Sequence, residues 1–305
     1  MPISNSSRQT VCDIQPIEST HTITVADIQA ALPKMRADIH KYQRGHVWIF
    51  GGSTGFAGAP QLSALGAMAA GAGLVSIVCT EDVYPIIATH QLATMVHPQT
   101  TFNWQQIKSK SSTLVAGPGW GHAHADTLSQ LIAFPTPLIV DADALNTLAQ
   151  KESLVQQLTM RTHLTILTPH HGEAARLLHC SSHEIIANRS QSIRKLANKF
   201  QCWVVLKGAN TLIASPSNSL WHCPFGNPNL ARAGTGDVLA GVIAAMVKAG
   251  EHAASVAITL PAAVALHALA GESDQWFHAG ELAALIHQQR NALLATTHHD
   301  DNVRQ

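Results

Sequence analysis

Several features are scarce in this sequence, and each scarcity excludes a class of protein. Charged residues make up only 12% of the 305 positions, and no basic run or stripe indicates a nucleic-acid surface. No stretch approaches the roughly 18 uninterrupted apolar residues of a membrane span, and the first ten residues, MPISNSSRQT, lack the apolar core of a signal peptide. We therefore expect a protein that binds neither nucleic acid nor membrane.

Cysteines are few, scattered and odd in number: Cys12, Cys79, Cys180, Cys202 and Cys223. They form no CxxC pair and predict no disulfide framework, which favours a cytoplasmic location. Histidines are abundant, at 19, but none has the spacing of a zinc site. No metal ligand can be named from the sequence.

The remaining composition is that of a globular α/β protein. Lys+Arg and Asp+Glu both number 19, so the formal net charge is zero, and 46% of the residues are hydrophobic. This balance suits buried parallel strands flanked by alanine-rich helices, together with contacts between subunits. We expect small molecules as partners and a homo-oligomer.

One stretch, from Asn227 to Gly250, carries the clearest chemical signal. Gly234 and Gly236 precede an apolar pattern with helical spacing, which predicts a glycine turn that leads into a helix. The first turn of such a helix offers unpaired N–H groups and binds anions. A carboxylate beside a phosphate site can accept a proton from an attacking hydroxyl, so Asp237 is a candidate general base. The alternative is a plain turn with Asp237 as a helix cap.

The chain repeats a strand, loop and helix unit from residue 46 onward. The run His46–Phe50 predicts a buried strand, residues 51–60 a glycine-rich loop that includes Ala59, and residues 61–73 a helix of small side chains. Such a helix must pack closely, either against the sheet or against a neighbouring subunit. The next strand is predicted over Leu74–Cys79.

Further units follow the same plan. Residues 112–117 predict a strand, followed by the glycine loop 117–121 and a helix over 123–132. Residues 138–140 predict another strand, followed by Asp141 and Asp143, of which Asp143 is expected to cap the next helix. A strand ends at Thr168, and His170, Gly172 and Glu173 occupy the turn before another helix. Loops at the carboxyl ends of parallel strands share one edge of the sheet, so these loops predict one long cleft.

The rest of the chain predicts a hairpin and two helices. Two strand-like runs flank Lys207–Asn210, and helices are expected over 254–270 and 281–294. We expect one domain over 45–294. Residues 1–44 form an N-terminal segment with a short helix at Val25–Met35 introduced by Thr24, and residues 295–305 form a polar, disordered tail.

Six motifs at predicted strand ends resemble one family in the order they occur: GGSTGFAGAP, AGPGWG, VDADAL, LTPHHGEAARLL, VVLKGANTLIASP and AGTGDVLAGVIAAMV. They are similar to the NAD(P)H-hydrate dehydratases, the bacterial ADP-dependent branch of the ribokinase-like superfamily. Together they cover most of residues 45–270. The likeness implies a three-layer sandwich in which a mainly parallel sheet lies between helices.

The resemblance also implies an activity. In that family the terminal phosphoryl group of ADP is transferred to the hydroxyl of the S epimer of NADH hydrate (NADHX) or NADPH hydrate (NADPHX). The ester then eliminates phosphate and leaves NAD(P)H and AMP. ATP is a second candidate donor. We expect Mg²⁺ with the nucleotide, a separate NAD(P)HX epimerase in the pathway, and, by likeness, a tetramer.

Site residues follow from the same likeness. Asp237 would take the hydroxyl proton, and Gly234 to Gly236 would hold the moving phosphoryl group. The adenine nucleotide would lie at Gly236 and along the segment Lys207, Gly208, Ala209, Asn210 and Thr211. The hydrate would lie at Ala59, Gly119, His170 and Asp237.

Some assignments have simpler alternatives. Lys207 could be an exposed hairpin lysine, His170 a helix cap, and Asp141 only a support for the cleft. Arg232 departs from the small, glycine-rich segment usual before the anion loop, and it would either reach a phosphate or point to solvent. Two rival functions remain, a hydroxymethylpyrimidine or thiazole kinase and a non-catalytic nucleotide sensor. Retention of Asp237 argues against the sensor.

Overall fold

The computed structural model describes residues 20–32, 40–90, 92–108, 110–247 and 253–303. The strands are β1 (Thr20–Thr22), β2 (His46–Phe50), β3 (Leu74–Cys79), β4 (Met95–Pro98), β5 (Ser112–Ala116), β6 (Leu138–Val140), β7 (Thr165–Leu167), β8 (Trp203–Leu206), β9 (Leu212–Ala214) and β10 (Leu220–His222). The helices are α1 (Val25–Ala31), α2 (Gly58–Ala70), α3 (Tyr84–His90), α4 (Ala125–Ala133), α5 (Ala142–Gln150), α6 (Glu152–Thr159), α7 (His171–Leu178), α8 (Ser182–Ala187), α9 (Arg189–Phe200), α10 (Thr235–Met246), α11 (Ala253–Ala270) and α12 (Ala279–Val303). Short 3-10 turns occupy Lys41–Arg44, Trp104–Gln106 and Pro228–Leu230.

All described strands form one sheet, with the order β1-β10-β9-β8-β7-β6-β5-β2-β3-β4. Every pairing is parallel except β10 with β9 and β9 with β8, so the predicted hairpin after Lys207 is confirmed. The predicted three-layer arrangement is confirmed as well. Because the strands are covered on both faces, they read as continuous apolar runs in the sequence.

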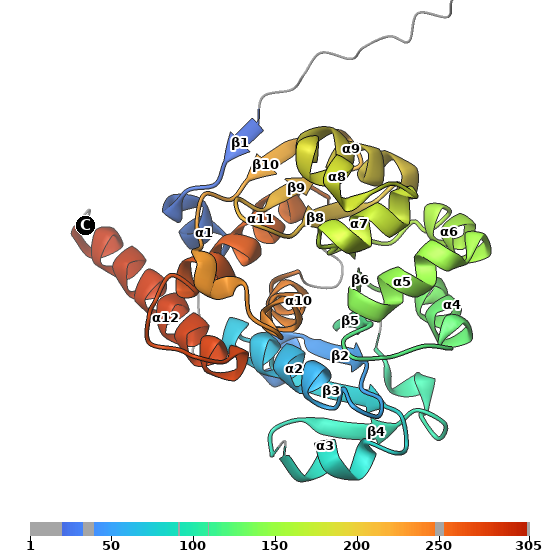
Figure 1. Ribbon diagram of the computed structural model, residues 1–305. Coiled ribbons are helices and arrows are strands. Elements are labelled where there is room, and N and C mark those ends of the chain that lie inside the picture. The colour runs from blue at the N-terminus through green and yellow to red at the C-terminus, as the bar shows by residue number, and fades with distance from the viewer. Residues whose placement is uncertain (1–19, 33–39, 91, 109, 248–252, 304–305) are drawn as a thin grey trace, which may run out of the picture.

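Alternate residues of each strand face two separate cores. Val47 and Ile49 of β2 join the core under α1, α2, α10, α11 and α12, whereas Trp48 and Phe50 face the helices from α4 to α9. Figure 1 shows α10 near the middle of the molecule with α2 beside it. Helix α10, which follows the anion loop, is therefore surrounded by other helices and by the sheet.

Helices α2 and α10 cross at glycines. A side chain at Gly66 would overlap the Val238 carbonyl, and one at Gly241 would overlap the Ser63 carbonyl. The small-residue helix expected from the sequence thus packs closely within the chain, against α10. This close approach also brings the Ser63 hydroxyl to donate to the Asp237 carbonyl at 2.8 Å.

The ends of the chain differ from the expectation in two places. The N-terminal segment contributes β1, which pairs in parallel with β10 at the edge of the sheet, and Thr24 caps α1 as predicted, although Met35 lies outside the described residues. The tail expected to be disordered instead continues α12 to Val303. Among the described helices, none is both long enough and apolar enough to cross a membrane.

Candidate active site

The anion loop has the backbone geometry that the sequence predicts. Gly234 is the residue before α10 and has a φ of 88°, a conformation that favours glycine. Its Cα faces Leu62 of α2, with no space for a side chain. Helix α10 then begins at Thr235, so Gly236 and Asp237 lie in its first turn, where N–H groups point outward and favour negative charge.

Lys207 extends from the end of β8 to this helix start. A Cβ placed on Gly236 would lie 3.3 Å from the Lys207 Nζ atom, and the lysine side chain is only 18% exposed. The alternative of an exposed hairpin lysine is therefore wrong. A phosphoryl group at the start of α10 would be held between backbone N–H groups on one side and an ammonium group on the other.

Two carboxylates hold the Lys207 ammonium group in place. The Nζ atom lies 2.6 Å from Asp141 Oδ1 and 3.8 Å from Glu173 Oε2. Thr168 donates a hydrogen bond of 2.8 Å to the same Asp141 oxygen. Burial lowers the pKa of Lys207, but the neighbouring Asp141 and Glu173 charges more than offset this, so its pKa is raised overall and it is positively charged.

Asp237 belongs to a cluster with an excess of negative charge, formed by Asp141, Asp143, Glu173, Asp237 and the Lys207 ammonium group. Burial raises its pKa to about 7, Asp141 adds to the rise, and Lys207 opposes it. Burial also raises the pKa of Glu173. An aspartate with a pKa near neutrality is ionised often enough to accept a proton and basic enough to hold it. This behaviour is that of a general base, beyond what a helix cap requires.

Asp143 does not have the capping role that the sequence predicts. The residue before α5 is Asp141, which makes no side-chain cap because its carboxylate binds Lys207 and Thr168. Helix α5 starts one residue later, at Ala142, so Asp143 lies inside its first turn. There its Oδ2 atom accepts a hydrogen bond of 2.8 Å from the Gly121 backbone N–H.

His170 caps α7. Its Nδ1 atom accepts hydrogen bonds from Gly172 N at 2.9 Å and Glu173 N at 3.3 Å, and the His170 N–H donates to Glu173 Oε2 at 2.8 Å. The Nε2 atom, which carries the proton in this arrangement, lies 3.4 Å from Glu173 Oε1. Burial and the nearby Lys207 lower the pKa of His170, which favours the neutral ring. The same histidine therefore caps the helix and orients Glu173.

Ala59 and Gly119 come together where the first two glycine loops meet. Gly119 has a φ of 58°, and a Cβ there would lie 2.6 Å from the Phe56 carbonyl oxygen and 2.9 Å from Ala59 Cβ. The Ser53 hydroxyl donates to the Gly119 carbonyl at 3.0 Å, which joins the first glycine loop to the second. The two loops form a close-packed wall beside Gly121 and Asp143.

The turn after Lys207 is held in place by a residue that does not belong to the charged cluster. Arg189 of α9 donates to the carbonyls of Ala209 and Asn210 at 2.6 and 2.9 Å, and the Thr211 hydroxyl donates to the Gly208 carbonyl at 3.0 Å. Gly208 has a φ of 148° and packs against the His171 ring. Gly208 to Thr211 are thus the tip of the hairpin that positions Lys207.

Arg232 is exposed, as one of its two alternatives predicts, but its side chain also packs against Trp276. Its guanidinium carbon lies 4.8 Å from the centre of the Trp276 ring, and Nη1 donates to the Trp276 carbonyl at 2.8 Å. The Arg232 carbonyl in turn accepts a 3.0 Å hydrogen bond from the Thr235 hydroxyl. The arginine braces the anion loop from behind.

Sequence reasoning did not assign Glu173 to the site, and it treated Asp141 as a support. The signal for Glu173 was present, because a glutamate three residues after a capping residue faces the helix start. No group of three or more His, Cys, Asp or Glu side chains forms a metal cage in the part of the chain that the structure describes. The donor set still fits Mg²⁺, which needs only one or two carboxylates beside substrate phosphates.

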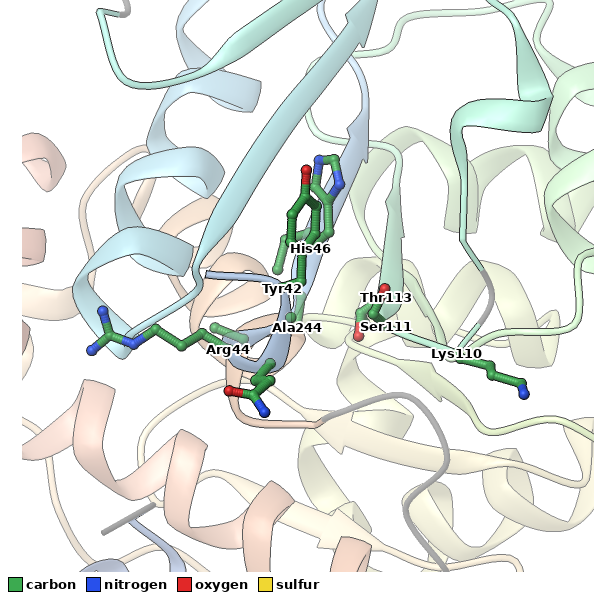
Figure 2. A pocket seen from close by; sticks show the side chains of 11 residues that line it. Tyr42, Arg44, His46, Lys110, Ser111, Thr113 and Ala244 are labelled. Carbon is green, nitrogen blue, oxygen red and sulfur yellow. The ribbon is translucent and has the colours of Figure 1, made fainter. Parts of the chain in front are cut away.

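Another cavity, of about 150 Å³, lies far from these residues (Figure 2). It is lined by Tyr42, His46 and Ser111, at the amino ends of β2 and β5. Arg44 and Lys110 line it as well (Figure 2). Ligands of parallel sheets bind at the opposite, carboxyl edge, so this cavity carries no chemistry for the site.

Comparison with known proteins identifies relatives of this arrangement. A family model described as NAD(P)H-hydrate dehydratase matches residues 47–289. A bifunctional NAD(P)H-hydrate repair enzyme of Coxiella burnetii is 36% identical over 244 residues, which cover 79% of this chain and 48% of the relative. The chain thus spans about half the length of that relative.

Two further relatives match over most of their length. The ADP-dependent (S)-NAD(P)H-hydrate dehydratase of Neisseria meningitidis is 37% identical over 222 residues, or 71% of this chain and 74% of the relative. The crystal structure of the ADP/ATP-dependent NAD(P)H-hydrate dehydratase of Bacillus subtilis, co-crystallised with ATP and Mg²⁺, superimposes with a TM-score of 0.76 and 26% identity. It covers 90% of this chain and 99% of the other.

Proposed function

Because this chain belongs to the NAD(P)H-hydrate dehydratase family, we propose that it uses ADP to convert the S epimers of NADHX and NADPHX to NADH and NADPH, with release of AMP and phosphate. The observation that carries this proposal is the position of Asp237. A carboxylate with a pKa near 7 stands in the first turn of α10, beside the helix start that would hold a phosphoryl group.

The reaction would proceed in two stages. Asp237 accepts the proton of the hydrate hydroxyl as its oxygen bonds to the terminal phosphorus of ADP and the bond from that phosphorus to the AMP oxygen breaks. The N–H groups of Gly234 to Gly236 and the Lys207 ammonium group stabilise the charge on the moving phosphoryl group. The new ester then loses phosphate from C6 and a proton from C5, which restores the ring double bond.

The two substrates would occupy adjoining sites that meet near Glu173. The adenine nucleotide would lie along Lys207 to Thr211 and at Gly236, and the hydrate would lie against Ala59, Gly119 and His170. Mg²⁺ would neutralise the charge of the donor phosphates, and Asp143 and Glu173 would be its candidate protein ligands. ATP, which has the same terminal group, would be a second donor.

Other properties follow from the proposal. We propose that the catalytic domain spans residues 45–294 and works in the cytoplasm, where the free thiols of Cys79, Cys180, Cys202 and Cys223 would stay reduced. A tetramer, expected from family likeness, is testable by light scattering. Because only the S epimer would react, an NAD(P)HX epimerase activity would supply it from the R form.

The test is direct. Purified protein is incubated with acid-generated NADHX, Mg²⁺ and either ADP or ATP, and the absorbance of the restored dihydronicotinamide is followed. Recovery with ADP, and AMP formed in step, would support the reaction and identify the donor. If neither nucleotide restores the absorbance, the proposal fails and a screen of small alcohols for kinase activity comes next.

A further inference from the structure

A groove of about 420 Å³ lies between α5 and α7. Helix α5 lines it with Asn146 and Gln150, α7 lines it with Gly172 and Arg176, and His179 follows directly after α7. Gly172 is two residues from His170, so the groove opens where the cleft ends. Its volume lies within the range of about 300 to 1,000 Å³ that is usual for small-molecule sites.

The charge of the groove is opposite to that of the catalytic cluster. Arg176 is its one permanently charged residue, and none of the residues that line it is an aspartate or glutamate. The cluster beside it contains the carboxylates of Asp141, Asp143, Glu173 and Asp237. The groove therefore attracts an anionic group, and no carboxylate in its lining opposes that attraction.

The Arg176 guanidinium group is held in place for binding. Its Nε atom donates to Asn146 Oδ1 at 2.8 Å, and the Asn146 amide nitrogen lies 3.4 Å from Asp143 Oδ1. Among the residues that the structure describes, the two Nη groups of Arg176 make no hydrogen bond. Nη1 lies 3.8 Å from the position of a Cβ on Gly172, so the planar group lies over the start of α7. A planar pair of N–H donors suits the oxygens of a phosphate.

Helix α7 separates this groove from the Lys207 hairpin. On one side the His171 ring packs against Gly208, where a Cβ would lie 2.9 Å from the ring. On the other side Gly172 and Arg176 face α5. If the phosphoryl donor occupies the hairpin side, the groove serves the other substrate.

Building on the proposed function, we propose that the groove between α5 and α7 binds a phosphate-bearing part of the hydrate dinucleotide, with Arg176 as the anion ligand and Asn146 as the residue that positions it. A dinucleotide carries a pyrophosphate bridge, and the NADPH form carries a 2′-phosphate as well. With the hydrated ring at Gly119 and His170, the rest of the molecule would lead past Gly172 into the groove.

The test compares Arg176→Gln with the parent protein in the dehydratase assay. We expect the KM for the hydrate to rise by about tenfold or more, whereas kcat and the KM for ADP change by less than about twofold, because a charged hydrogen bond is lost from ground-state and transition-state binding alike. Arg176→Lys should recover part of the affinity, and Asn146→Ala should raise the same KM by a smaller factor. Lys195→Gln, which removes an exposed charge from α9, should change nothing.

Two arms separate the phosphate sources. If Arg176→Gln raises the KM for both hydrates, Arg176 binds the pyrophosphate bridge. If it raises the KM for NADPHX alone, Arg176 binds the 2′-phosphate. Either result supports the proposed role of the groove. Unchanged hydrate KM values, or a rise confined to ADP, overturn it.

Calorimetric binding of NADH and NADPH, which needs no turnover, separates this inference from the function. Binding that depends on Arg176 in a protein without dehydratase activity would refute the function and keep the groove. If Arg176→Gln changes neither turnover nor binding, the proposed role of the groove is refuted and the proposed function stands.

Discussion

The Lys207 ammonium group lies 2.6 Å from an Asp141 carboxylate oxygen, although the two residues are 66 positions apart in the chain. This ion pair joins the end of β8 to the end of β6. It also fixes the one lysine charge of the cluster beside the start of α10. Its position sets how strongly the neighbouring carboxylates hold their protons, and therefore at what pH the site works.

The rate should depend on pH through Asp237. Because burial raises the pKa of this group to about 7 and the base must be ionised, kcat/KM should rise with pH and level off above about 7 to 8. Asp237→Asn should lower turnover by roughly a hundredfold or more and leave ADP binding nearly intact. Stopped assays at a series of pH values, with calorimetric titration of ADP, check both. Unchanged turnover in the variant would remove Asp237 from the mechanism.

The same substitution should stabilise the fold at high pH. A carboxyl group whose pKa rises from 3.8 to about 7 on folding binds more protons in the folded chain, so the free energy of unfolding falls as pH rises from about 4 to 7. Asp237→Asn removes this cost, worth at most about 4 kcal/mol at pH 8. Urea melts at pH 5 and pH 8 measure it. A variant that is no more stable than the parent at pH 8 would contradict the raised pKa.

Lys207→Met should shift the pH profile. Because the lysine charge lowers the pKa of Asp237, its removal should move the acidic limb of the profile to higher pH. The KM for ADP should rise, and the free energy of unfolding should fall by on the order of 3 kcal/mol, since Asp141 is left buried without its ion-pair partner. Lys195→Met, at an exposed position on α9, is the matched control. Identical profiles for the two variants would exclude Lys207 from the cluster.

Gly119 should be intolerant of any side chain. Gly119→Ala would place a Cβ 2.6 Å from the Phe56 carbonyl oxygen and push the two glycine loops apart. We expect the KM for the hydrate to rise by about tenfold, the scale for a misplaced substrate-binding wall. Gly55→Ala is the control, because Gly55 also has a positive φ but nothing lies within 4 Å of its added Cβ. Equal kinetic effects of the two variants would attribute the loss to backbone strain alone.

Arg232→Ala should act on the anion loop and not on phosphate directly. Loss of the contact with the Trp276 ring and of the hydrogen bond to its carbonyl should lower the free energy of unfolding by about 1 to 2 kcal/mol. The KM for ADP should change much less than in Lys207→Met. Thermal melts and ADP titrations of both variants test this. A loss of ADP affinity as large as that of the lysine variant would show that Arg232 reaches the phosphates.

Most of the architecture could be predicted from local pattern. Strands β2, β3, β5, β6 and β7 are apolar runs that the sequence predicts, and the loops after them share one edge because the strands are parallel. Strand β4, which is only partly buried, was not predicted. Strand β1 escaped prediction because its three exposed residues have no pattern of their own, and only pairing with β10 makes them a strand. Asp143 was misassigned because the helix starts two residues earlier than expected, which exchanges the roles of two aspartates.

The site residues that lie within one short motif could be predicted from the sequence. Contacts between residues that are far apart in the chain could not. Asp237 and Gly234 to Gly236 are read from one short segment. The contact of Lys207 with Asp141, the stack of Arg232 on Trp276 and the placement of Arg176 beside Asn146 each join residues that are far apart in the chain. No spacing rule connects such pairs, and only the packed sheet brings them together.

The edge strand β1 has a consequence for how the chain folds. Thr20 lies opposite Leu220, so about two hundred residues must be made and ordered between the two partners, which places this pairing among the slowest to form. A ribosome would release β1 about two hundred residues before its partner β10. The N-terminal segment would therefore wait beside a growing sheet and dock last, as the final strand of a nearly complete fold.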